Sequence, residues 1–195
     1  SEEIPLKRGL LQGSSISPLL FNIFINELLV GLQRLPKIPL GGALWNHLFF
    51  ADDGALMATN NSDANKLTAK AHGWGVDNGI QYAIEKCKFI GTEGTTWSIQ
   101  MNGVPLQQVP DYKYLGIYMA PRGINFVKSL KERANACLQM VNWMSSKGMN
   151  TSGWRLQQSI TVYKSFLRSM MEYSLCLKIL HKKEVEILQK VQNAA

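Results

Sequence analysis

The sequence predicts an α+β protein, with mixed helix and antiparallel sheet over residues 1–121 and helices alone over residues 122–195. In the first part, apolar runs separated by two-residue turn signals such as Asn102-Gly103 indicate hairpins. Beyond Gly123, apolar residues recur at helical spacing only. The charge changes near the same boundary, because residues 1–121 carry 9 Lys and Arg against 10 Asp and Glu, whereas residues 122–195 carry 12 against 4. We therefore expect two domains that meet near residue 121.

Size and composition are those of a globular protein with a substantial core. The 195 residues are 46% hydrophobic and 18% charged, which excludes a disordered chain. No run approaches the roughly 18 apolar residues of a membrane span, and the N-terminus does not resemble a signal peptide, so we expect no membrane partner. Cys87, Cys137 and Cys176 lack metal-type or redox-type spacing. We expect them to be reduced thiols in an intracellular compartment.

The first helix is predicted from Leu19 to about Leu32. Ser17 suits the N-cap and Pro18 the first helical position, where a missing N–H costs nothing. Apolar side chains on most sides of this segment predict a buried helix packed under a sheet. They are Leu20, Phe21, Ile23, Phe24, Ile25, Leu28 and Leu29. In the preceding loop, Gly13 allows the backbone to approach a ligand closely, although a plain loop would look similar.

A hairpin with two adjacent acids is predicted at residues 48–58. Strand residues flank Asp52-Asp53-Gly54, which indicates a tight turn with carboxylates at the tip of a buried hairpin. Adjacent carboxylates repel each other, so a fold that holds them in such a place commonly needs a cation there. The alternative is a solvated turn in which aspartate serves only as a turn former.

The rest of the first part contains one weak helix and short strands. The helix is capped by residues 61–63 and runs to about Trp74, and Gly73 and Gly75 weaken it. The segments that follow are a mixed turn and strand at residues 80–90, a hairpin at residues 97–106, and a strand at residues 109–119 with Gly116 in its interior.

The second part is predicted to be a bundle of three helices, at residues 126–145, 154–180 and 181–192. Its excess of positive charge indicates that a polyanion lies along it. The alternative is an ordinary solvated helix surface, because no single run of Lys and Arg is dense.

Several short motifs follow one another along the chain. They are Gln12-Gly13-x-x-x-Ser17-Pro18-x-Leu20-Phe21-Asn22-Ile23, Phe50-Ala51-Asp52-Asp53, residues 79–86, Tyr114-Leu115-Gly116, and Tyr163-Lys164-x-x-Leu167-Arg168-Ser169-x-x-Glu172-Tyr173 with Gln192-Asn193. In this order they resemble motifs B, C, D and E and the thumb of the reverse transcriptases of non-LTR (LINE-like) retrotransposons. The resemblance covers nearly the whole chain. It implies a partial polymerase palm, an antiparallel sheet with packed helices, at residues 1–121, and a basic, all-α thumb at residues 122–195.

The resemblance also implies RNA-directed DNA synthesis by nucleotidyl transfer. Such a reaction uses two Mg²⁺ ions about 3.5–4 Å apart. Asp52 and Asp53 are the implied catalytic metal ligands, because Mg²⁺ prefers hard carboxylate oxygens. Lys86 would protonate the leaving pyrophosphate. Lys88 is a rival for that role, and an ordinary surface lysine is the alternative for Lys86.

The implied partners are RNA and DNA, as a template–primer duplex or as a structural RNA. Residues with the implied role of contacting the incoming nucleotide and template are Gln12, Gly13, Ser17, Pro18, Phe50 and Ala51. The implied primer grip is Tyr114, Leu115 and Gly116, for which a packed strand is the alternative. The implied contacts to the nucleic-acid backbone are Lys128, Lys131, Arg133, Lys164 and Arg168.

The sequence departs from the family pattern in three places. Phe50 replaces the tyrosine common in retroviral relatives, and Ala83 stands where the family often has asparagine. Motif A, with the first catalytic aspartate, lies upstream of motif B in the family, and only eleven residues precede Gln12. We therefore expect weak Mg²⁺ binding and no polymerisation by this chain alone. The chain is interpreted as a fragment or a split subunit of a retrotransposon reverse transcriptase, and one possible partner is another polypeptide that supplies fingers and motif A. The alternative is a domesticated, non-catalytic RNA-binding or scaffold component of a larger ribonucleoprotein.

Overall fold

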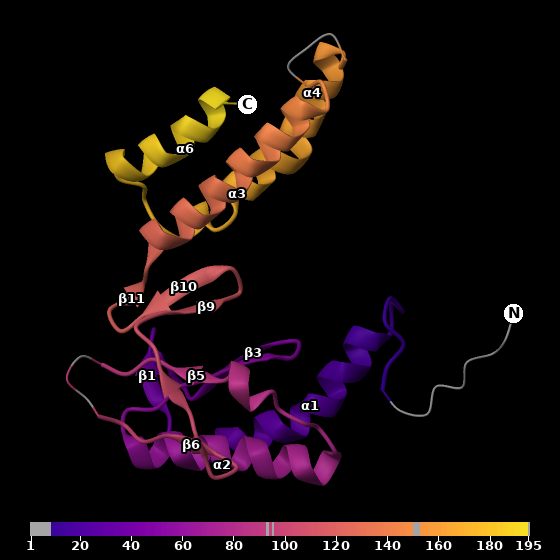
Figure 1. Ribbon diagram of the computed structural model, residues 1–195. Coiled ribbons are helices and arrows are strands. Elements are labelled where there is room, and N and C mark those ends of the chain that lie inside the picture. The colour runs from indigo at the N-terminus through magenta and orange to yellow at the C-terminus, as the bar shows by residue number, and fades with distance from the viewer. Residues whose placement is uncertain (1–8, 93, 95, 150–152, 195) are drawn as a thin grey trace, which may run out of the picture. The chain divides into compact units, whose positions relative to one another are not determined.

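A computed structural model describes residues 9–92, 94, 96–149 and 153–194 (Figure 1). The chain divides into two compact units, Ser1–Pro110 (unit 1) and Asp111–Ala195 (unit 2). Both combine helices with small sheets, and every strand pair but one is antiparallel among the described residues. The α+β class is therefore confirmed. The units divide after Pro110, whereas the sequence placed the boundary near residue 121.

Two helices form the core of unit 1. Helix α1 (Ser17–Gln33) packs on α2 (Asn61–Asn78). The buried side chains between and around them are Ile25, Leu28, Leu32, Leu67, Ala71, Trp74 and Met101. This burial of apolar surface stabilises the unit, because each fully buried leucine contributes about 1.5–3 kcal/mol.

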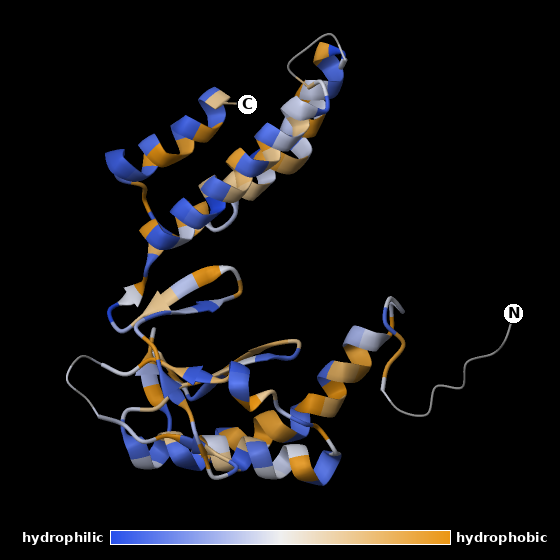
Figure 2. Cartoon of the chain, in the orientation of Figure 1, coloured by the Kyte–Doolittle hydropathy of each residue, from blue (hydrophilic) through white to orange (hydrophobic). Residues whose placement is uncertain are grey.

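Helix α1 is buried on one side only, so the prediction of a helix covered on most sides is wrong. Leu19 and Ile23 are 59% and 64% exposed, and apolar colour runs along the helix in Figure 2. The predicted cap is also wrong. Ile16 is the N-cap, and the Ser17 hydroxyl instead donates to the Leu11 carbonyl at 2.7 Å. The loop turns back at this point, and the serine hydroxyl binds a carbonyl of the loop backbone instead of capping the helix.

Helix α2 is longer than its sequence predicts. Its cap is Asn60, whose side-chain oxygen accepts from the Asp63 N–H, and it continues through both glycines to Asn78. At Gly75 an added Cβ would lie 2.6 Å from the Tyr82 ring. The glycine therefore lets that ring pack against the helix, and this contact outweighs the weak helix propensity.

The strands of unit 1 are short. They are β1 (Ile38–Leu40), β2 (Ala43–Trp45), β3 (His47–Phe50), β4 (Asp53–Leu56), β5 (Lys88–Phe89), β6 (Gln100–Met101), β7 (Val104–Pro105) and β8 (Gln107–Gln108). Strands β1–β2, β3–β4 and β6–β7 form antiparallel hairpins, whereas β5 pairs with β8 in parallel. The predicted hairpin at residues 97–106 is confirmed. Its turn, Asn102-Gly103, has positive φ at both residues, as a type I′ turn requires.

Unit 2 begins with a three-stranded antiparallel sheet in the order β11-β10-β9. The strands are β9 (Tyr112–Tyr114), β10 (Ile117–Ala120) and β11 (Gly123–Ile124). The prediction of one strand through Gly116 is wrong, because the chain reverses at Leu115-Gly116. Both residues have positive φ, 48° and 76°, which is the signature of a type I′ hairpin turn.

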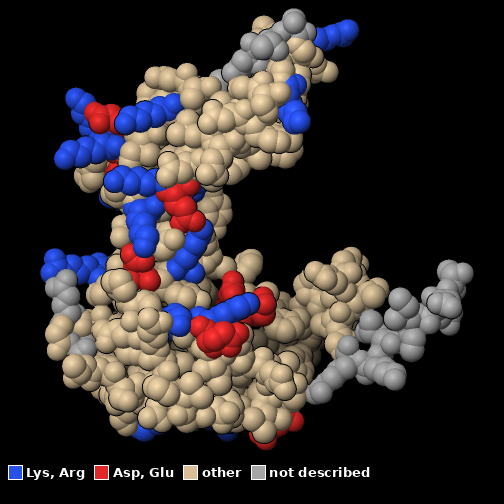
Figure 3. Space-filling model, in the orientation of Figure 1, with Lys and Arg blue, Asp and Glu red and all other residues tan. Residues whose placement is uncertain are grey.

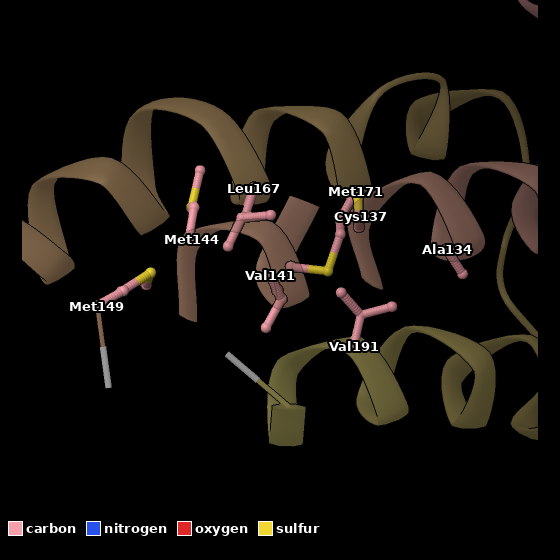
Figure 4. Packing of buried hydrophobic residues seen from close by; sticks show 8 residues of the cluster. All are labelled: Ala134, Cys137, Val141, Met144, Met149, Leu167, Met171 and Val191. Atoms are coloured by element: carbon pink, nitrogen blue, oxygen red, sulfur yellow. The ribbon is translucent and has the colours of Figure 1, made fainter. Parts of the chain in front are cut away.

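The rest of unit 2 is a helical bundle. Its elements are α3 (Phe126–Ser146), α4 (Leu156–Val162), the π-helical η2 (Tyr163–Arg168), α5 (Ser169–Glu172), the 3₁₀ turn η3 (Leu175–Leu177) and α6 (Lys182–Ala194). Elements α4, η2 and α5 follow one another without a break, and we call them together the α4–α5 helix. Side chains from α3, the α4–α5 helix and α6 point toward one another in Figure 4. The predicted helix at residues 154–180 ends instead at Glu172, and left-handed Ser174 (φ 63°) follows. A turn there lets α6 fold back onto α3.

The methionines of this bundle fill an irregular core. Met144, Met149 and Met171 are buried beside Cys137 and Leu167. Methionine suits such gaps because its unbranched side chain adapts to its neighbours. Among the described residues, no helix combines the length and apolar character needed to cross a bilayer.

Candidate functional site

The two adjacent acids lie at the tip of the β3–β4 hairpin. Phe50 pairs with Asp53, so the two-residue turn is Ala51-Asp52. The prediction of a turn at Asp52-Asp53-Gly54 is therefore displaced, because Asp53 already begins β4. Ala51 adopts a left-handed φ of 51°, which is uncommon for a residue with a Cβ and costs about 1–2 kcal/mol.

The hairpin tip is exposed to solvent, so the prediction of a buried hairpin is wrong. Asp52 and Asp53 are both exposed, and Phe50 beside them is 65% exposed. Phe49 points the other way and packs against the core of unit 1. Water weakens the repulsion between two exposed carboxylates, so the hairpin needs no cation in order to fold. A metal role must therefore be argued on other grounds.

Gly54 admits the Phe49 ring to the opposite strand. The two residues are direct partners in the β3–β4 pair. A Cβ on Gly54 would lie 2.5 Å from Cε1 of Phe49, far inside van der Waals contact. The glycine after the acids thus serves ring packing, and φ at this position is not in the left-handed region.

Asn46 ties the base of this hairpin to the C-terminal end of α1. The side chain is 1% exposed. Its Nδ2 faces three carbonyl oxygens, those of Leu32 at 2.6 Å and of Leu35 and Pro36 at 3.1 Å. The backbone carbonyl of Asn46 accepts from the Met57 N–H at 2.9 Å. One side chain therefore donates to carbonyls in the last turn of α1 and just beyond it, where helix ends commonly lack partners.

The same amide fixes the orientation of His47. The Oδ1 of Asn46 lies 2.7 Å from Nδ1 of His47, and an amide oxygen can only accept, so His47 donates from Nδ1. Burial lowers the pKa of His47, and the nearby positive charge of Lys37 lowers it further. Both effects favour the neutral form of the imidazole, which the hydrogen bond to Asn46 holds at the hairpin base.

The motif B residues precede and begin α1. Gln12 and Gly13 are exposed in the loop, and Gly13 has a φ of 91° with open space, free of other atoms to 4 Å, where a side chain would stand. Ser17 and Pro18 start the helix. A helix of 17 residues spans about 25 Å. Gln12 and the hairpin base therefore lie at opposite ends of α1.

The two candidate lysines differ in their surroundings. Lys86 is exposed at the end of the 3₁₀ turn η1 (Ile84–Lys86). Lys88 lies in β5, and its Nζ donates to Oε1 of Gln107 at 2.9 Å. The side chain of Lys88 is thus engaged with the neighbouring strand, and Lys86 is the more exposed of the two.

The two carboxylates are the kind of ligand that Mg²⁺ prefers, but they supply only some of the ligands that a magnesium site needs. Asp52 and Asp53 offer exposed, hard oxygen donors, as Mg²⁺ prefers. In the described part of the chain, no group of three or more His, Cys, Asp or Glu side chains is arranged to hold a metal ion. Further ligands would have to come from a nucleotide, from water or from other protein.

The candidate grip turn, Leu115-Gly116, lies at the tip of the β9–β10 hairpin in unit 2. The Tyr173 hydroxyl donates to the Leu115 carbonyl at 2.8 Å. A Cβ on Gly116 would lie 3.2 Å from Cε1 of Tyr173. The alternative prediction, a packed strand, does not describe Leu115 and Gly116, because they form a turn that is held by Tyr173, the residue after α5.

Basic side chains gather over the helices of unit 2 in Figure 3, and several are engaged within the unit. Lys128 pairs with Asp111 at 2.6 Å, and Arg168 pairs with Glu172 at 2.7 Å. Arg133 is half-buried and donates to the Tyr173 carbonyl and, at 3.0 Å, to the Ser174 hydroxyl. Within the described residues, the exposed side chains of Lys131 and Lys164 have no such partner.

An open depression of about 540 Å³ lies beside α3. It is lined by Tyr118, Asn125, Val127, Lys128, Lys131, Glu132 and Asn135. The Lys128 ammonium stands 4.2 Å from the Tyr118 ring centroid. Hydrogen bonding to Lys113 and then to Tyr118 lowers the pKa of Glu132. The depression therefore holds charges of both signs.

Sequence reasoning missed the side chain of Asn46 and the contacts of Tyr173, which it quoted only as part of the thumb motif. Each acts on residues far away in the chain, 10–14 positions for Asn46 and 58 for Tyr173. The one available signal for Asn46 was an amide between apolar strand residues, and such a side chain is buried only when it is hydrogen-bonded. The thumb motif contains Tyr173, but no local signal indicated its hydrogen bond to Leu115.

Comparison with known proteins identifies what these residues belong to. Residues 1–119 match the family model described as reverse transcriptase (RNA-dependent DNA polymerase). The chain is 29% identical over 135 residues to the Retrovirus-related Pol polyprotein from type-2 retrotransposable element R2DM of Drosophila melanogaster. This match covers 63% of this chain and 13% of that protein. It is 40% identical over 65 residues to the Retrovirus-related Pol polyprotein from type-1 retrotransposable element R2 of Popillia japonica. This second match covers 31% of this chain and 9% of that protein. The chain thus spans a small part of these relatives.

Proposed function

Because this chain belongs to the reverse transcriptase (RNA-dependent DNA polymerase) family, we propose that unit 1 carries part of a nucleotidyl-transfer site at the tip of the β3–β4 hairpin. Asp52 and Asp53 are its metal ligands. The observation that supports this role is the hairpin itself, which presents both carboxylates to solvent from a base fixed by buried Asn46. Both carboxylates therefore face solvent at the tip of an anchored hairpin.

Each residue of the site has a distinct task. Reverse transcriptase domains generally use Mg²⁺, which stabilises the attacking and leaving oxygens when bound. The carboxylates of Asp52 and Asp53 would hold the Mg²⁺ ion, and exposed Phe50 lies against the nucleotide or template. Lys86, exposed at the end of η1, donates a proton to the leaving pyrophosphate.

Motif B supplies further contacts to the nucleotide and template. Gln12 and Gly13 lie in an exposed loop, and Ser17 and Pro18 begin α1. A backbone with no side chain at Gly13 permits close approach of a base or sugar. Together with the hairpin, these residues make unit 1 a partial palm.

Residues 122–195 are a thumb that binds the template–primer backbone. Support comes from charge, because residues 122–195 carry 12 Lys and Arg against 4 Asp and Glu. Lys131 and Lys164 are exposed without a protein partner among the described residues, so they are the first contacts to phosphate. Lys128 and Arg168 contribute further phosphate contacts when they give up their ion pairs with Asp111 and Glu172. Such surface ion pairs are worth about 0–1 kcal/mol each. The Leu115-Gly116 turn is the primer grip.

Protein beyond residues 1–195 completes the catalytic centre. Two carboxylates do not make a two-metal site, and motif A supplies an aspartate that this sequence has in no matching context. The exposed apolar face of α1 supports an added protein layer. The residues of that face are Leu19, Leu20, Ile23, Phe24 and Val30. We expect this chain alone to show no Mg²⁺-dependent polymerisation.

Primer extension on an RNA template tests the catalytic proposal. The chain alone is expected to give no extension, and addition of a polypeptide that carries motif A is expected to restore it. Asp52→Asn should then abolish extension, because it removes one ligand charge, whereas the matched variant Asp77→Asn at an exposed helix position should not. Robust extension by the chain alone, or unchanged extension with Asp52→Asn, contradicts the proposal.

A second function, favoured by the charge of unit 2, is nucleic-acid binding without catalysis as a component of a ribonucleoprotein. Binding of an RNA–DNA duplex at several salt concentrations tests it. Replacement of Lys131 and Lys164 by glutamine should flatten the log–log salt dependence by about 0.7–0.9 per lost phosphate contact. Lys70→Gln in unit 1 is the control. An unchanged slope removes these lysines from the interface.

A further inference from the structure

Tyr173 connects the end of the α4–α5 helix to the tip of the β9–β10 hairpin. Its hydroxyl donates to the Leu115 carbonyl at 2.8 Å. Its ring lies against Gly116, where a Cβ would be only 3.2 Å from Cε1 and 3.8 Å from the hydroxyl oxygen. The turn therefore meets Tyr173 through one hydrogen bond and one close packing contact.

Tyr173 is itself held on its other side. The Arg133 guanidinium donates to the Tyr173 carbonyl and to the Ser174 hydroxyl. The guanidinium carbon also lies 5.3 Å from the centroid of the Tyr173 ring, within the range of a cation–π contact. Backbone and ring of Tyr173 are thus fixed to α3 rather than left to swing in solvent.

The base of the same hairpin is attached to the start of α3. The Asn125 N–H donates to the Tyr118 carbonyl at 2.7 Å. The Tyr118 N–H donates to the Ser129 hydroxyl at 2.9 Å. The hairpin is therefore joined to the helices at both ends, at the base by α3 and at the tip by Tyr173.

The turn needs such support. Leu115 has a left-handed φ of 48°, which is uncommon for a bulky residue. Residues in sparsely populated conformations persist where the surroundings over-determine them, and they cluster at ligand contacts. The contact from Tyr173 falls on the carbonyl of this strained residue.

We propose that Tyr173 is a positioning residue that locks the Leu115-Gly116 turn where it meets the 3′-terminal sugar-phosphate of a primer strand. This inference rests on the proposed role of that turn as a primer grip. Tyr173 does not touch the reacting atoms. It acts through the turn, and Arg133 acts through Tyr173.

The test uses Tyr173→Phe in the full chain, since phenylalanine keeps the ring against Gly116 and removes only the hydroxyl. The control is Tyr163→Phe, whose hydroxyl makes no hydrogen bond among the described residues. The first readout is amide hydrogen exchange at residues 112–118 without nucleic acid. We expect Tyr173→Phe alone to accelerate it about fivefold, the factor expected for one typical net hydrogen bond.

The second readout distinguishes positioning from mere packing. A template–primer with 4-thiothymidine at the primer 3′ end is photo-crosslinked, and the yield in residues 112–118 is divided by the fraction bound. We expect this ratio to fall in Tyr173→Phe and to stay unchanged in the control, with no change in overall affinity. Gly116→Ala should lower it as well, because its Cβ would displace the Tyr173 ring.

Each outcome decides the inference. Unchanged exchange at residues 112–118 in Tyr173→Phe overturns the lock. Faster exchange with an unchanged crosslink ratio overturns the positioning role. If the wild-type chain binds template–primer and gives no crosslink in these residues, the grip assignment fails, and the positioning role fails with it. If the wild-type chain does not bind at all, the thumb proposal fails as well, and the exchange data alone then decide the lock.

Discussion

The β3–β4 hairpin is anchored at its base, whereas the β9–β10 hairpin is anchored at its tip as well. Asn46 fixes the base of the first hairpin to α1 and leaves the Ala51-Asp52 tip exposed. The second hairpin is fixed at its base by Asn125 and at its tip by Tyr173. An anchored base with an exposed tip suits a site that must admit metal and nucleotide. A tip that is also held suits a surface that must keep a strand in place.

The two turns also differ in backbone chemistry. The second residue is glycine in the turns at Gly41-Gly42, Asn102-Gly103 and Leu115-Gly116, as the left-handed conformation favours. The turn at the acids is Ala51-Asp52, with alanine in the left-handed position. Its conformation therefore depends on the anchored strands rather than on the residues of the turn.

The largest expected effect comes from releasing the base of the first hairpin. Asn46→Ala leaves the Leu32, Leu35 and Pro36 carbonyls without their donor, which should lower the stability of unit 1 by about 2–4 kcal/mol. Hydrogen exchange of the β3 and β4 amides measures the loss. The control is Asn22→Ala at an exposed position of α1. An equal, small effect of both substitutions would show that the base is not anchored by Asn46.

The next effect comes from the glycine beside the acids. Gly54→Ala places a Cβ 2.5 Å from the Phe49 ring, so the ring must move, and we expect a loss of about 1–3 kcal/mol. Gly73→Ala should have the opposite sign and gain up to about 1 kcal/mol, because the position is helical and open. Urea unfolding of the β3–β4 hairpin and of α2, followed by amide signals, measures both. A stabilising Gly54→Ala would contradict the packing described here.

A smaller effect is expected at the first turn itself. Ala51→Gly should stabilise unit 1 by up to about 1 kcal/mol, because relief of the left-handed conformation outweighs the entropy cost of glycine. Ala51→Val should destabilise it, since a β-branched residue tolerates this φ poorly. Thermal unfolding of the two variants is the measurement. The same order of stabilities at a position outside the turn would indicate a general effect of side-chain size.

The smallest effect is expected from pH at the second hairpin. Lys113 and Tyr118 lower the pKa of Glu132 and so join β9 and β10 to α3. This contribution is complete above the ordinary glutamate pKa of about 4.3 and is lost as the pH falls through the lowered pKa. Hydrogen exchange at residues 112–118, corrected for its intrinsic pH dependence, should therefore accelerate at acidic pH. Glu132→Gln should remove that dependence, and a dependence that persists assigns the effect to another group.

The sequence predicted correctly the features that depend on a short stretch of neighbouring residues. The Asn102-Gly103 hairpin and the paired acids on a hairpin were predicted correctly as features, because turn chemistry is local. Leu115-Gly116 was predicted as strand, since leucine is not a usual first residue of a type I′ turn and a single glycine also occurs in strand interiors. The exposure of α1 was not predictable either, because an all-round apolar pattern reads the same whether or not other protein covers it. Asn46 and Tyr173 act through long-range contacts that only the fold creates.

The central claim is that the tip of the β3–β4 hairpin is a divalent-metal site that this chain supplies in part. Paramagnetic broadening of backbone amide signals by Mn²⁺, which binds the same hard oxygen ligands as Mg²⁺, tests it most directly. We predict weak, selective broadening around Asp52 and Asp53 that strengthens with template–primer and nucleotide and disappears in Asp52→Asn. Broadening that is equal at exposed Asp77, or that persists in Asp52→Asn, would contradict the claim.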